Sequence, residues 1–348
     1  MSVPVAAPER RLRIAAYTGG RNVPGARFRV RQYVEAMLQF GIELNEFTSR
    51  VGQYPPDVAW RRPAWLLAAW AERSLQIPQS YRYDAVIFQR ELISTLLTLE
   101  PLFGRPRMLD VDDAIWLHPR GAFAGKLAAR CDAVICGNAY LADYFGQHCE
   151  QVFLLPTAVD TRRFVPLQDL CSPTQIIGWS GTSSNLIELE RIEPALRAVM
   201  GRFAKARLRV VCSRRPSLVS LPADRVDYVP WSPAIEVSAL QDLRVGLMPL
   251  QEAAWARGKC AFKMLTYMAC GVPVVASPVG MNGDVLAMGS IGFGANTHDE
   301  WVDALATLLA ESDAARRMGD VGRALIDAHF SVEVLSGRLA EIIRAVVG

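Results

Sequence analysis

The segment GKCAFKMLTYMACGVPVVAS, from Gly258 to Ser277, has the clearest structural pattern in the chain. Helix-forming residues run from Lys259 to Ala269, Gly271 ends the run, and Pro273 opens a short apolar stretch. The pattern predicts a loop, a helix, a turn and a buried strand, in that order. A unit of this kind is typical of a doubly wound α/β domain.

The predicted helix is amphipathic. At about 100° per residue, Lys259 and Lys263 fall on one face with Thr266 and Cys270, and the opposite face is apolar. The whole chain has only four lysines, so this pairing stands out. A helix start with free N–H groups and two ammonium groups suits a diphosphate, which predicts a donor-phosphate site; an ordinary solvated helix face is the alternative.

Short apolar runs alternate with longer helical patterns along the rest of the chain, which predicts parallel βαβ units. At 348 residues the chain exceeds the usual size of a single core, so two domains are expected. The predicted strands of the first half are Leu12–Tyr17, Ala85–Phe88, Met108–Val111, Ala133–Cys136 and Val152–Leu155. Those of the second half are Gln175–Trp179, Leu208–Cys212, Val245–Met248 and Val272–Ala276.

The domain boundary is predicted in Val165–Thr174, which has two prolines and little periodicity. We expect a first Rossmann-like domain over residues 1–166 and a second over residues 167–330. After Ser331, which suits a helix cap, residues 331–348 present one apolar helical face and are expected to dock as a terminal helix. The predicted architecture is two doubly wound domains facing each other across a cleft, with ligands beyond the carboxyl ends of the strands.

Composition limits the functional classes. Hydrophobic residues make up 51% and charged residues 21%, the net charge is only +3, and no window is apolar enough for a membrane-spanning helix. The low net charge gives no reason to expect nucleic acid as a partner. Because Met1–Arg13 lacks the apolar core of a secretory signal, a cytoplasmic location is expected. The seven scattered cysteines predict buried reduced thiols and no structural zinc.

The run FKMLTYMACGVPVVAS (Phe262–Ser277), followed by Pro278-Val279-Gly280, resembles the donor-site helix and strand of retaining glycosyltransferases of family 4, of the group 1 type. Further similar motifs follow the family's order along nearly the whole chain. Those motifs are Leu155–Asp160 with Phe164 and Pro166, Ile177–Thr182, Trp231, Met248–Leu250, Trp301 and Met318-Gly319.

This resemblance implies the GT-B fold and transfer of a sugar from a nucleoside diphosphate sugar to a hydroxyl acceptor, with retained anomeric configuration. The acceptor would be a polysaccharide, a glycolipid or a small molecule. It also implies that no cofactor or bound metal is needed, with the nucleotide sugar as co-substrate. The implied donor-binding residues are Gly181, Thr182, Trp231, Glu252, Gly258, Lys259, Lys263 and Thr266.

The sequence departs from the family's pattern in two places. Where the family usually has two glutamates eight positions apart, this chain has Gly258 and Thr266. A threonine hydroxyl holds a ribose more weakly than a carboxylate does, and Glu252 is a substitute candidate. The loop after Gly178 lacks the usual basic pair, so phosphate neutralisation is assigned to the two lysines, with backbone N–H groups of Gly181 and Thr182 assisting.

Carboxylates cluster after a predicted strand, in Asp110-Val111-Asp112-Asp113. They could bind a divalent metal, act as a phosphatase-type nucleophile, or be structural; we favour acceptor binding or active-site ordering by Asp112 and Asp113. The resemblance places His118 near the reacting sugar, where it would hydrogen-bond a hydroxyl of the donor sugar or the developing charge and would not act as a general base; a merely exposed loop histidine is the alternative. The implied catalytic set is therefore His118, Lys263 and Asp112.

The remaining acceptor-side candidates follow other strands of the first half. Gly19 and Gly20 would permit close backbone approach to a ligand. Arg29 would either grip a phosphate or begin a solvated helix. Asn138 would line the cleft or only cap a helix.

The segment Pro63–Leu75 mixes arginines with tryptophan. On a helical wheel Leu67, Trp70, Ala71 and Leu75 cluster, with Arg73 on the other side. The pattern predicts either a peripheral contact with the inner face of the membrane, or core packing of an ordinary amphipathic helix.

Two other functions stay open. A nucleotide-sugar epimerase could use the same fold without an acceptor. The replaced glutamates also allow a non-catalytic partner protein that keeps only the scaffold.

Overall fold

The computed structural model describes residues 10–167 and 175–348, which form two compact units. Unit 1 consists of the chain up to Ala158 together with Val332–Gly348, and unit 2 is Val159–Ser331. Of the predicted linker Val165–Thr174, only the first three positions are described; Met1–Glu9 and Cys171 also lie outside the described residues.

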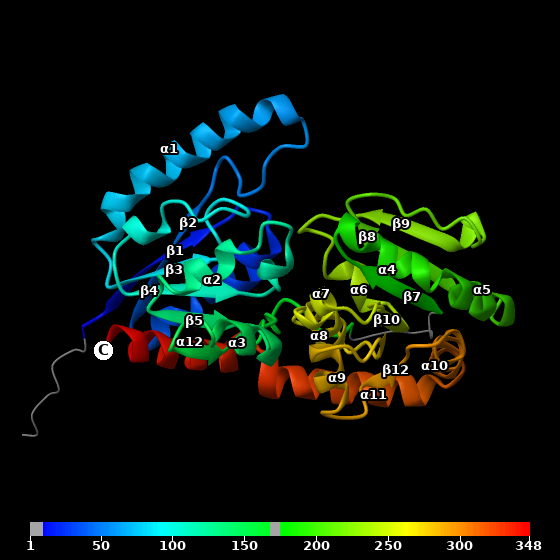
Figure 1. Cartoon of the computed structure of the whole chain (residues 1–348). Helices are drawn as coiled ribbons and strands as arrows, with labels where there is room; N and C mark the ends of the chain where they lie inside the picture. The colour runs from blue at the N-terminus through cyan, green and yellow to red at the C-terminus, as the bar shows by residue number, and fades with distance from the viewer. Residues whose placement is uncertain (1–9, 168–174) are drawn as a thin grey trace, which may run out of the picture. The chain divides into compact units, whose positions relative to one another are not determined.

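Unit 1 is built on a six-stranded parallel sheet with the order β2-β1-β3-β4-β5-β6 (Figure 1). The strands are β1 (Leu12–Thr18), β2 (Ile42–Thr48), β3 (Ala85–Gln89), β4 (Arg107–Val111), β5 (Ala133–Cys136) and β6 (Val152–Leu154). The strand order reverses between β1 and β3, and ligands of doubly wound sheets bind at such a reversal, beyond the carboxyl ends of the strands.

Unit 2 has its own six-stranded parallel sheet, with the order β12-β11-β10-β7-β8-β9. The strands are β7 (Ile176–Ser180), β8 (Arg207–Cys212), β9 (Val226–Pro230), β10 (Val245–Met248), β11 (Val274–Ala276) and β12 (Gly292–Gly294). Here the order reverses between β7 and β10, which makes the loops after these two strands the expected ligand position.

Helices cover both sheets. Those of unit 1 are α1 (Arg62–Ser80), α2 (Phe123–Ala128), α3 (Ala139–Phe145) and α12 (Val332–Val347). Those of unit 2 are α4 (Leu186–Arg191), α5 (Glu193–Arg202), α6 (Ser238–Gln241), α7 (Ala254–Arg257), α8 (Phe262–Ala269), α9 (Met281–Leu286), α10 (His298–Ala310) and α11 (Ser312–Leu325). Short 3-10 or π segments are η1 (Ala26–Val30), η2 (Arg31–Tyr33), η3 (Ala36–Phe40), η4 (Ala59–Arg61), η5 (Glu100–Leu102), η6 (Ile115–Leu117), η7 (Ser183–Asn185), η8 (Ala223–Arg225) and η9 (Ile326–Phe330).

Each unit has a core of its own. In unit 1 the C-terminal helix α12, red in Figure 1, buries Leu335, Leu339 and Ile343 in the same cluster as Ile14 of β1. The prediction of a terminal docking helix is confirmed, because its apolar face packs here against residues from the start of the chain. In unit 2, Trp179 of β7 lies fully buried in the sheet's core.

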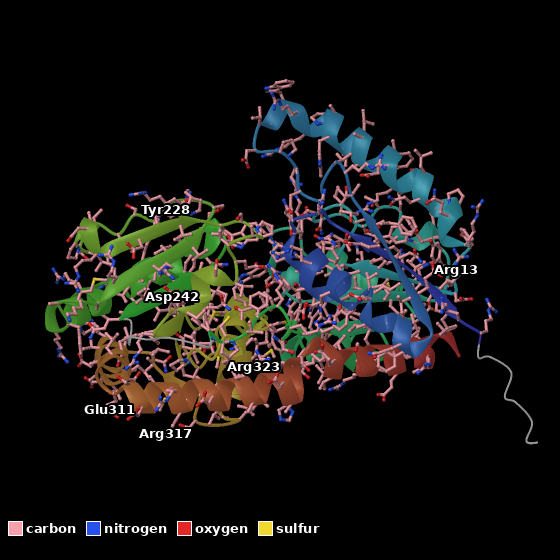
Figure 2. All side chains as sticks on the ribbon, turned by 180° about the vertical axis from the view of Figure 1, so that it is seen from behind. Arg13, Tyr228, Asp242, Glu311, Arg317 and Arg323 are labelled. Carbon is pink, nitrogen blue, oxygen red and sulfur yellow. The ribbon has the colours of Figure 1, made fainter. Side chains whose placement is uncertain are left out.

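Arg323 of α11, labelled in Figure 2, fastens three segments of unit 2. Its guanidinium donates to the carbonyls of Phe164 (2.7 Å), Ala269 (2.8 Å) and Thr161 (3.2 Å). Ala269 is the last residue of α8, where a cation is favourable because helix C-terminal carbonyls carry partial negative charge. Residues 161–164 are thereby held within unit 2.

The described cysteines are free thiols, and all but the half-buried Cys149 are buried, so the prediction of buried thiols is confirmed for Cys131, Cys136, Cys212, Cys260 and Cys270 and is wrong for Cys149. None of the helices in the described ranges has the length and apolar character required to cross a bilayer.

Candidate functional site

The helix after Gly258 begins later than the sequence predicts. Ala261 has a left-handed backbone (φ 51°), and α8 starts at Phe262. Such a conformation costs a non-glycine residue roughly 1–2 kcal/mol, so the surrounding packing must hold it. The predicted helix start at Lys259 is therefore wrong: of the two lysines only Lys263 lies on α8, and they do not share a helical face.

The face of α8 on which the sequence placed Thr266 and Cys270 is buried at these two residues and is not open to a ligand there. Thr266 is buried and its hydroxyl donates to the carbonyl of Lys263 at 2.7 Å. The hydroxyl of Tyr267 accepts a hydrogen bond from the N–H of Ser180 at 2.7 Å. A Cβ atom at Gly246 would lie 2.3 Å from the Tyr267 ring, so β10 needs glycine there to let the ring pass. These contacts fix α8 against the ends of β7 and β10, and they engage Thr266 inside the helix instead of offering it to a ribose.

Lys263 lies at the carboxyl end of β7. Its Nζ is 4.9 Å from the ring centroid of the buried Trp179. A Cβ atom at Gly181 would lie 2.7 Å from that ring and 3.0 Å from Cε of Lys263. The structure thus brings together two predicted donor-site residues, Lys263 and Gly181, on an aromatic platform that the sequence did not assign to the site.

The environment of Lys263 disfavours its charged form. Burial of the ammonium group, and next the nearby charge of Lys259, lower its pKa to about 7, although Glu188 and Cys212 act in the opposite direction. The side chain as a whole is half-buried, so the ammonium group is poorly hydrated without being sealed off. A poorly hydrated cation gains more from an arriving anion than a fully hydrated one does.

In the loop after β7, one of the two backbone N–H groups predicted to assist phosphate binding is engaged elsewhere, and the role of the other, the N–H of Thr182, stays a prediction. The N–H of Gly181 donates to the carbonyl of Val211 at 3.0 Å, so it continues the β7–β8 ladder and is not directed at a phosphate. The hydroxyl of Thr182 is engaged with Asn185, whose amide donates to it at 2.9 Å. Glycine is required at 181 because the Trp179 ring and Lys263 approach so closely.

The other lysine and its neighbours occupy the turn before α8. Nζ of Lys259 lies 5.4 Å from the ring centroid of Trp255, and Gly258 ends the short helix α7. Glu252, which follows β10, forms an ion pair with Arg257 at 2.7 Å, with both side chains more than half exposed. Exposed pairs of this kind contribute about 0–1 kcal/mol and exchange partners easily, so Glu252 stays a candidate for nucleotide binding.

Glu188 on α4 is a site residue that sequence reasoning missed. It accepts a hydrogen bond from the N–H of Gln251 at 3.0 Å, which links the helix after β7 to the loop after β10. Its charge acts on Lys263, as noted above. The available signal was an acidic residue in the first turn of the helix that follows the glycine loop.

Trp231 lies directly after β9. Its backbone N–H donates to the carbonyl of Cys212 at 3.0 Å, and its indole N–H donates to Glu236 at 3.3 Å. Glu236 in turn pairs with Arg163 at 2.8 Å. These contacts place Trp231 on the β8–β9 side of unit 2.

In unit 1, Arg29 is buried and paired. Its guanidinium contacts Asp110 at 2.5 Å, and it also donates to the carbonyl of Leu155 at 2.7 Å. Both side chains of the ion pair are almost fully buried. Neither predicted alternative for Arg29 holds, because the residue is neither solvated nor presented to a phosphate: it neutralises Asp110 at the centre of the sheet.

The other carboxylates gather around Arg90, at the carboxyl ends of β3 and β4. The amide of Gln89 contacts Asp112 at 3.5 Å, and Arg90 lies 3.6 Å from Asp113. Burial and the charge of Arg90 lower the pKa of His118. Arg90 has a left-handed backbone (φ 63°), and strained residues of this kind concentrate at functional sites.

Asp112, Asp113 and His118 are thus brought together, around an arginine that the sequence analysis did not select. Among residues 10–167 and 175–348, no three His, Cys, Asp or Glu side chains are grouped so as to hold a metal ion.

Two further acceptor-side candidates have structural roles. A Cβ atom at Gly19 would lie 2.2 Å from Oε1 of Gln53, so this glycine admits the Gln53 side chain. Asn138 caps α3 by accepting a hydrogen bond from the N–H of Leu141 at 2.9 Å, as its helix-cap interpretation predicts.

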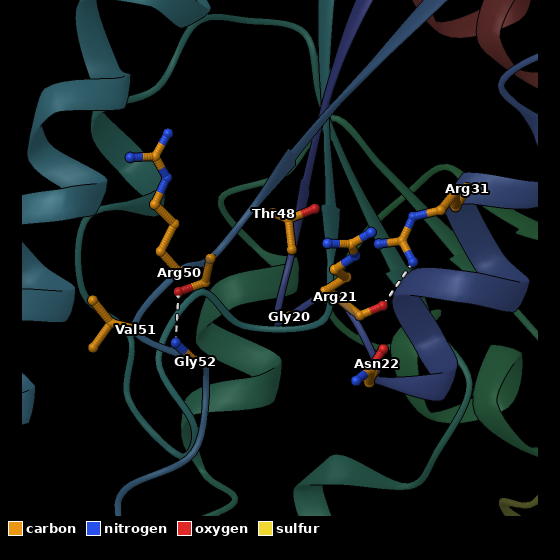
Figure 3. Close-up of a pocket in the computed structure, with 9 residues that line it drawn as sticks. Gly20, Arg21, Asn22, Arg31, Thr48, Arg50, Val51 and Gly52 are labelled. Carbon is orange, nitrogen blue, oxygen red and sulfur yellow. Dashed lines mark hydrogen bonds between the residues drawn. The ribbon is translucent and has the colours of Figure 1, made fainter. Parts of the chain in front are cut away.

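Gly20 lines a pocket beyond the carboxyl ends of β1 and β2 (Figure 3). The pocket has a volume of about 600 Å³, which is in the range of small-molecule sites. Its walls are residues 20–22, Arg31 and residues 48–52. Sequence reasoning included Gly20 but missed the second wall.

Comparison with known proteins agrees with this architecture. Residues 175–311, which contain β7, β10 and α8, match the family described as glycosyl transferases group 1. No curated protein sequence matches the chain.

Several solved structures have a similar fold. The Anabaena protein HepE, solved with UDP and glucose, is 14% identical with a TM-score of 0.69, over 96% of this chain and 100% of its own. A glycosyltransferase from Rickettsia africae is 13% identical with a TM-score of 0.64, over 97% and 99%. WaaG, a glycosyltransferase of lipopolysaccharide biosynthesis, is 12% identical with a TM-score of 0.65, over 95% and 99%. At these identities the likeness concerns the fold, and it confirms two Rossmann-like units of the GT-B type.

Proposed function

We propose that this protein is a glycosyltransferase of the retaining GT-B type that takes its sugar from a nucleoside diphosphate donor bound in unit 2. The observation that carries the proposal is Lys263, a dehydrated ammonium group held over Trp179 beside Gly181, at the strand-order reversal of the sheet. The group 1 match covers this region, and HepE was solved with UDP and glucose.

The residues of unit 2 fit a reaction in which the leaving diphosphate needs most help. When the bond between the sugar's anomeric carbon and the phosphate oxygen breaks, negative charge develops on the departing diphosphate. A preorganised ammonium group in a dry site stabilises that charge more than it stabilises the intact donor. Unit 2 therefore positions the donor and neutralises its departing diphosphate, and it needs no nucleophile of its own.

Donor binding is expected to take up a proton at Lys263. The ammonium group has a pKa of about 7 in the free protein, so at pH 8 it is mostly neutral, and a bound diphosphate favours its charged form. Titration calorimetry with UDP at pH 8, in buffers of different ionisation enthalpy, should show uptake of up to about one proton. At pH 6 the uptake should be small, because Lys263 is already charged.

A Lys263→Met variant is the matched control for this measurement, since it keeps the chain length without the titrating group. Equal proton uptake by the variant and the wild type at pH 8 would show that Lys263 does not meet the phosphates. The same pKa shift sets how the stability of the free protein depends on pH. Because folding lowers the pKa of Lys263 from 10.5 to about 7, its contribution to the free energy of unfolding increases as pH rises from about 7 to 10.5.

Product analysis separates the proposal from its alternatives. Incubation with nucleotide sugars and a panel of hydroxyl acceptors should give a glycosylated product and free nucleoside diphosphate. Epimerised sugar nucleotide without a glycosylated product would identify an epimerase. Donor binding without turnover of any donor would identify a non-catalytic partner, in line with the glycine and threonine at positions 258 and 266.

We further propose that α1 contacts a membrane surface. The apolar side chains that the helical wheel groups on one face are not packed in the core: the exposed fractions are 71% for Leu67, 51% for Trp70 and 75% for Leu75. Arg73, expected on the polar face, is instead buried and donates to the carbonyl of Thr18 at 2.7 Å. In Figure 1, α1 stands at the border of unit 1, and its exposed apolar side chains suit the interface of a bilayer.

The double variant Leu67→Glu, Trp70→Glu should lose binding to anionic vesicles by about tenfold or more, since burying each of these side chains is worth roughly 1.5–3 kcal/mol. Sedimentation with phosphatidylglycerol vesicles measures the effect. Val219→Glu, which changes an 89% exposed valine of unit 2, is the control and should bind as the wild type does. Unchanged sedimentation of the double variant would refute the membrane contact.

A further inference from the structure

The pocket of unit 1 has a prearranged wall. Glu72 of α1 holds the loop after β2, accepting from Oγ of Ser49 and from the N–H of Arg50, each at 2.8 Å. Ser49 Oγ also accepts from the N–H of Gly52 at 3.0 Å. The indole N–H of Trp65 donates to the carbonyl of Gly52 at 3.3 Å, so α1 supports this loop at two points.

Arg31 on the opposite wall is fixed in the same manner. It forms two hydrogen bonds of 2.7 Å to Glu46 and donates to the carbonyl of Arg21 at 2.7 Å. Glu46 is also held by the hydroxyl of Thr18 at 2.7 Å. One guanidinium group is therefore locked in place at the pocket before any ligand arrives.

The charge around this cavity is unbalanced. Three arginines, Arg21, Arg31 and Arg50, line it, while two carboxylates, Glu46 and Glu72, contact its walls, which leaves one positive charge uncompensated. In the described ranges, the guanidinium groups of Arg21 and Arg50 form no hydrogen bond and no ion pair. Figure 3 shows the side chains of Arg21 and Arg31 extending toward one another, with Arg50 on the far side of the pocket and directed away from them.

Glu46 already compensates Arg31, so the neighbouring guanidinium group of Arg21 keeps a positive charge that an arriving anion can balance. Arginine forks match the oxygens of a phosphoryl group in geometry and charge. None of the residues that line the cavity is aromatic, so its walls offer no platform for a base or for an apolar ring. The chemistry of the pocket is that of a site for a small polar anion.

We propose that this pocket binds the phosphoryl group of the acceptor, so that the transferase acts on a phosphorylated hydroxyl compound. The substrate class rests on the proposed transferase function; anion binding in the pocket does not. The carbohydrate or lipid portion extends beyond the two arginines, and the cavity of about 600 Å³ has room for a monosaccharide phosphate.

The test compares glucose 6-phosphate with glucose, which differ only in the phosphoryl group, in titration calorimetry with the full chain. Glucose 6-phosphate should bind, glucose should not, and inorganic phosphate should compete. Arg21→Gln should weaken binding about tenfold or more, as loss of a charged hydrogen bond does. The control Arg82→Gln, at an exposed site outside the pocket, should bind as the wild type does.

A second arm uses vesicles of phosphatidic acid against phosphatidylcholine. If Arg21→Gln weakens binding to phosphatidic acid but no soluble phosphate binds, the phosphoryl group belongs to a lipid-linked acceptor. If the variant changes binding of neither soluble phosphate nor phosphatidic acid, the inference is overturned.

The two proposals fail separately. Lys263→Ala should leave glucose 6-phosphate binding unchanged, because the lysine belongs to the other unit. Phosphate binding without any transfer from nucleotide sugars would refute the proposed function and keep the anion site. Transfer to neutral acceptors only, unaffected by Arg21→Gln, would keep the function and refute the phosphorylated substrate.

Discussion

Lys263→Ala should lower the rate of sugar transfer about a hundred- to a thousandfold, the usual effect of removing one preorganised group that stabilises developing charge. The ammonium group lies over Trp179, in surroundings that lower its pKa to about 7. Its positive charge therefore destabilises the free folded protein and becomes favourable only when an anion is bound. The variant should therefore remain folded. The measurement is the steady-state rate with a saturating nucleotide sugar, beside a thermal unfolding curve.

Lys205→Ala is the matched control, because Lys205 is exposed in the same unit and far in sequence from α8. It should transfer sugar at the wild-type rate. A Lys263→Ala variant that is folded and equally active would remove the reason for placing the donor phosphates at α8.

Arg29→Ala should destabilise the protein by about 3–5 kcal/mol, because it leaves Asp110 charged and unpaired in the interior of unit 1. Denaturant unfolding of the whole chain, followed by far-ultraviolet circular dichroism, would measure this loss. The double variant Arg29→Met, Asp110→Leu should recover most of it, since two apolar side chains can replace a buried ion pair.

The same pair of variants decides between a structural and a binding role for Arg29. A loss below about 1 kcal/mol in the single variant, with weaker acceptor binding, would restore the phosphate-gripping role that the sequence suggested. The full loss with rescue in the double variant would confirm the role that the contacts to Asp110 and Leu155 indicate.

The fold was predictable because buried parallel strands are continuous apolar runs. All nine strands predicted from such runs are present, with ends shifted by two residues at most. The three that were missed, β2, β9 and β12, are edge strands in the observed sheets. The sequence of β2, IELNEFT, carries polar residues, β9 ends in Pro230, and β12 is the tripeptide GFG. Edge strands lack a neighbour on one side, so their sequences are less apolar.

Because β2 was not predicted, one wall of a pocket could not be predicted either. Residues 48–52, which form one wall of the arginine-lined pocket, follow β2 directly. Without that strand the loop has no recognisable position, so no local pattern places Arg50 near Arg21 and Arg31. Periodicity reports which face of an element is apolar, but it does not report which loops meet in space.

Long-range contacts decided the remaining differences. The residues from Lys259 to Ala261 are all compatible with a helix, and only the packing around α8 sets Ala261 left-handed. Arg29 and Asp110 are 81 positions apart, so no local pattern shows that they neutralise each other. Lys263 was selected because it follows Lys259 at helical spacing, and its role at the donor stays a prediction. Trp179, over which its ammonium group lies, is in the sequence only a candidate core residue.

The most direct test of the donor site is a calorimetric titration with nucleoside diphosphates and the matching monophosphates, on the wild type and Lys263→Ala. We predict that at least one diphosphate binds the wild type, that its monophosphate binds more weakly, and that the variant loses the difference. Equal affinity of diphosphate and monophosphate for the wild type, or an undiminished difference in the variant, would contradict a diphosphate site at Lys263.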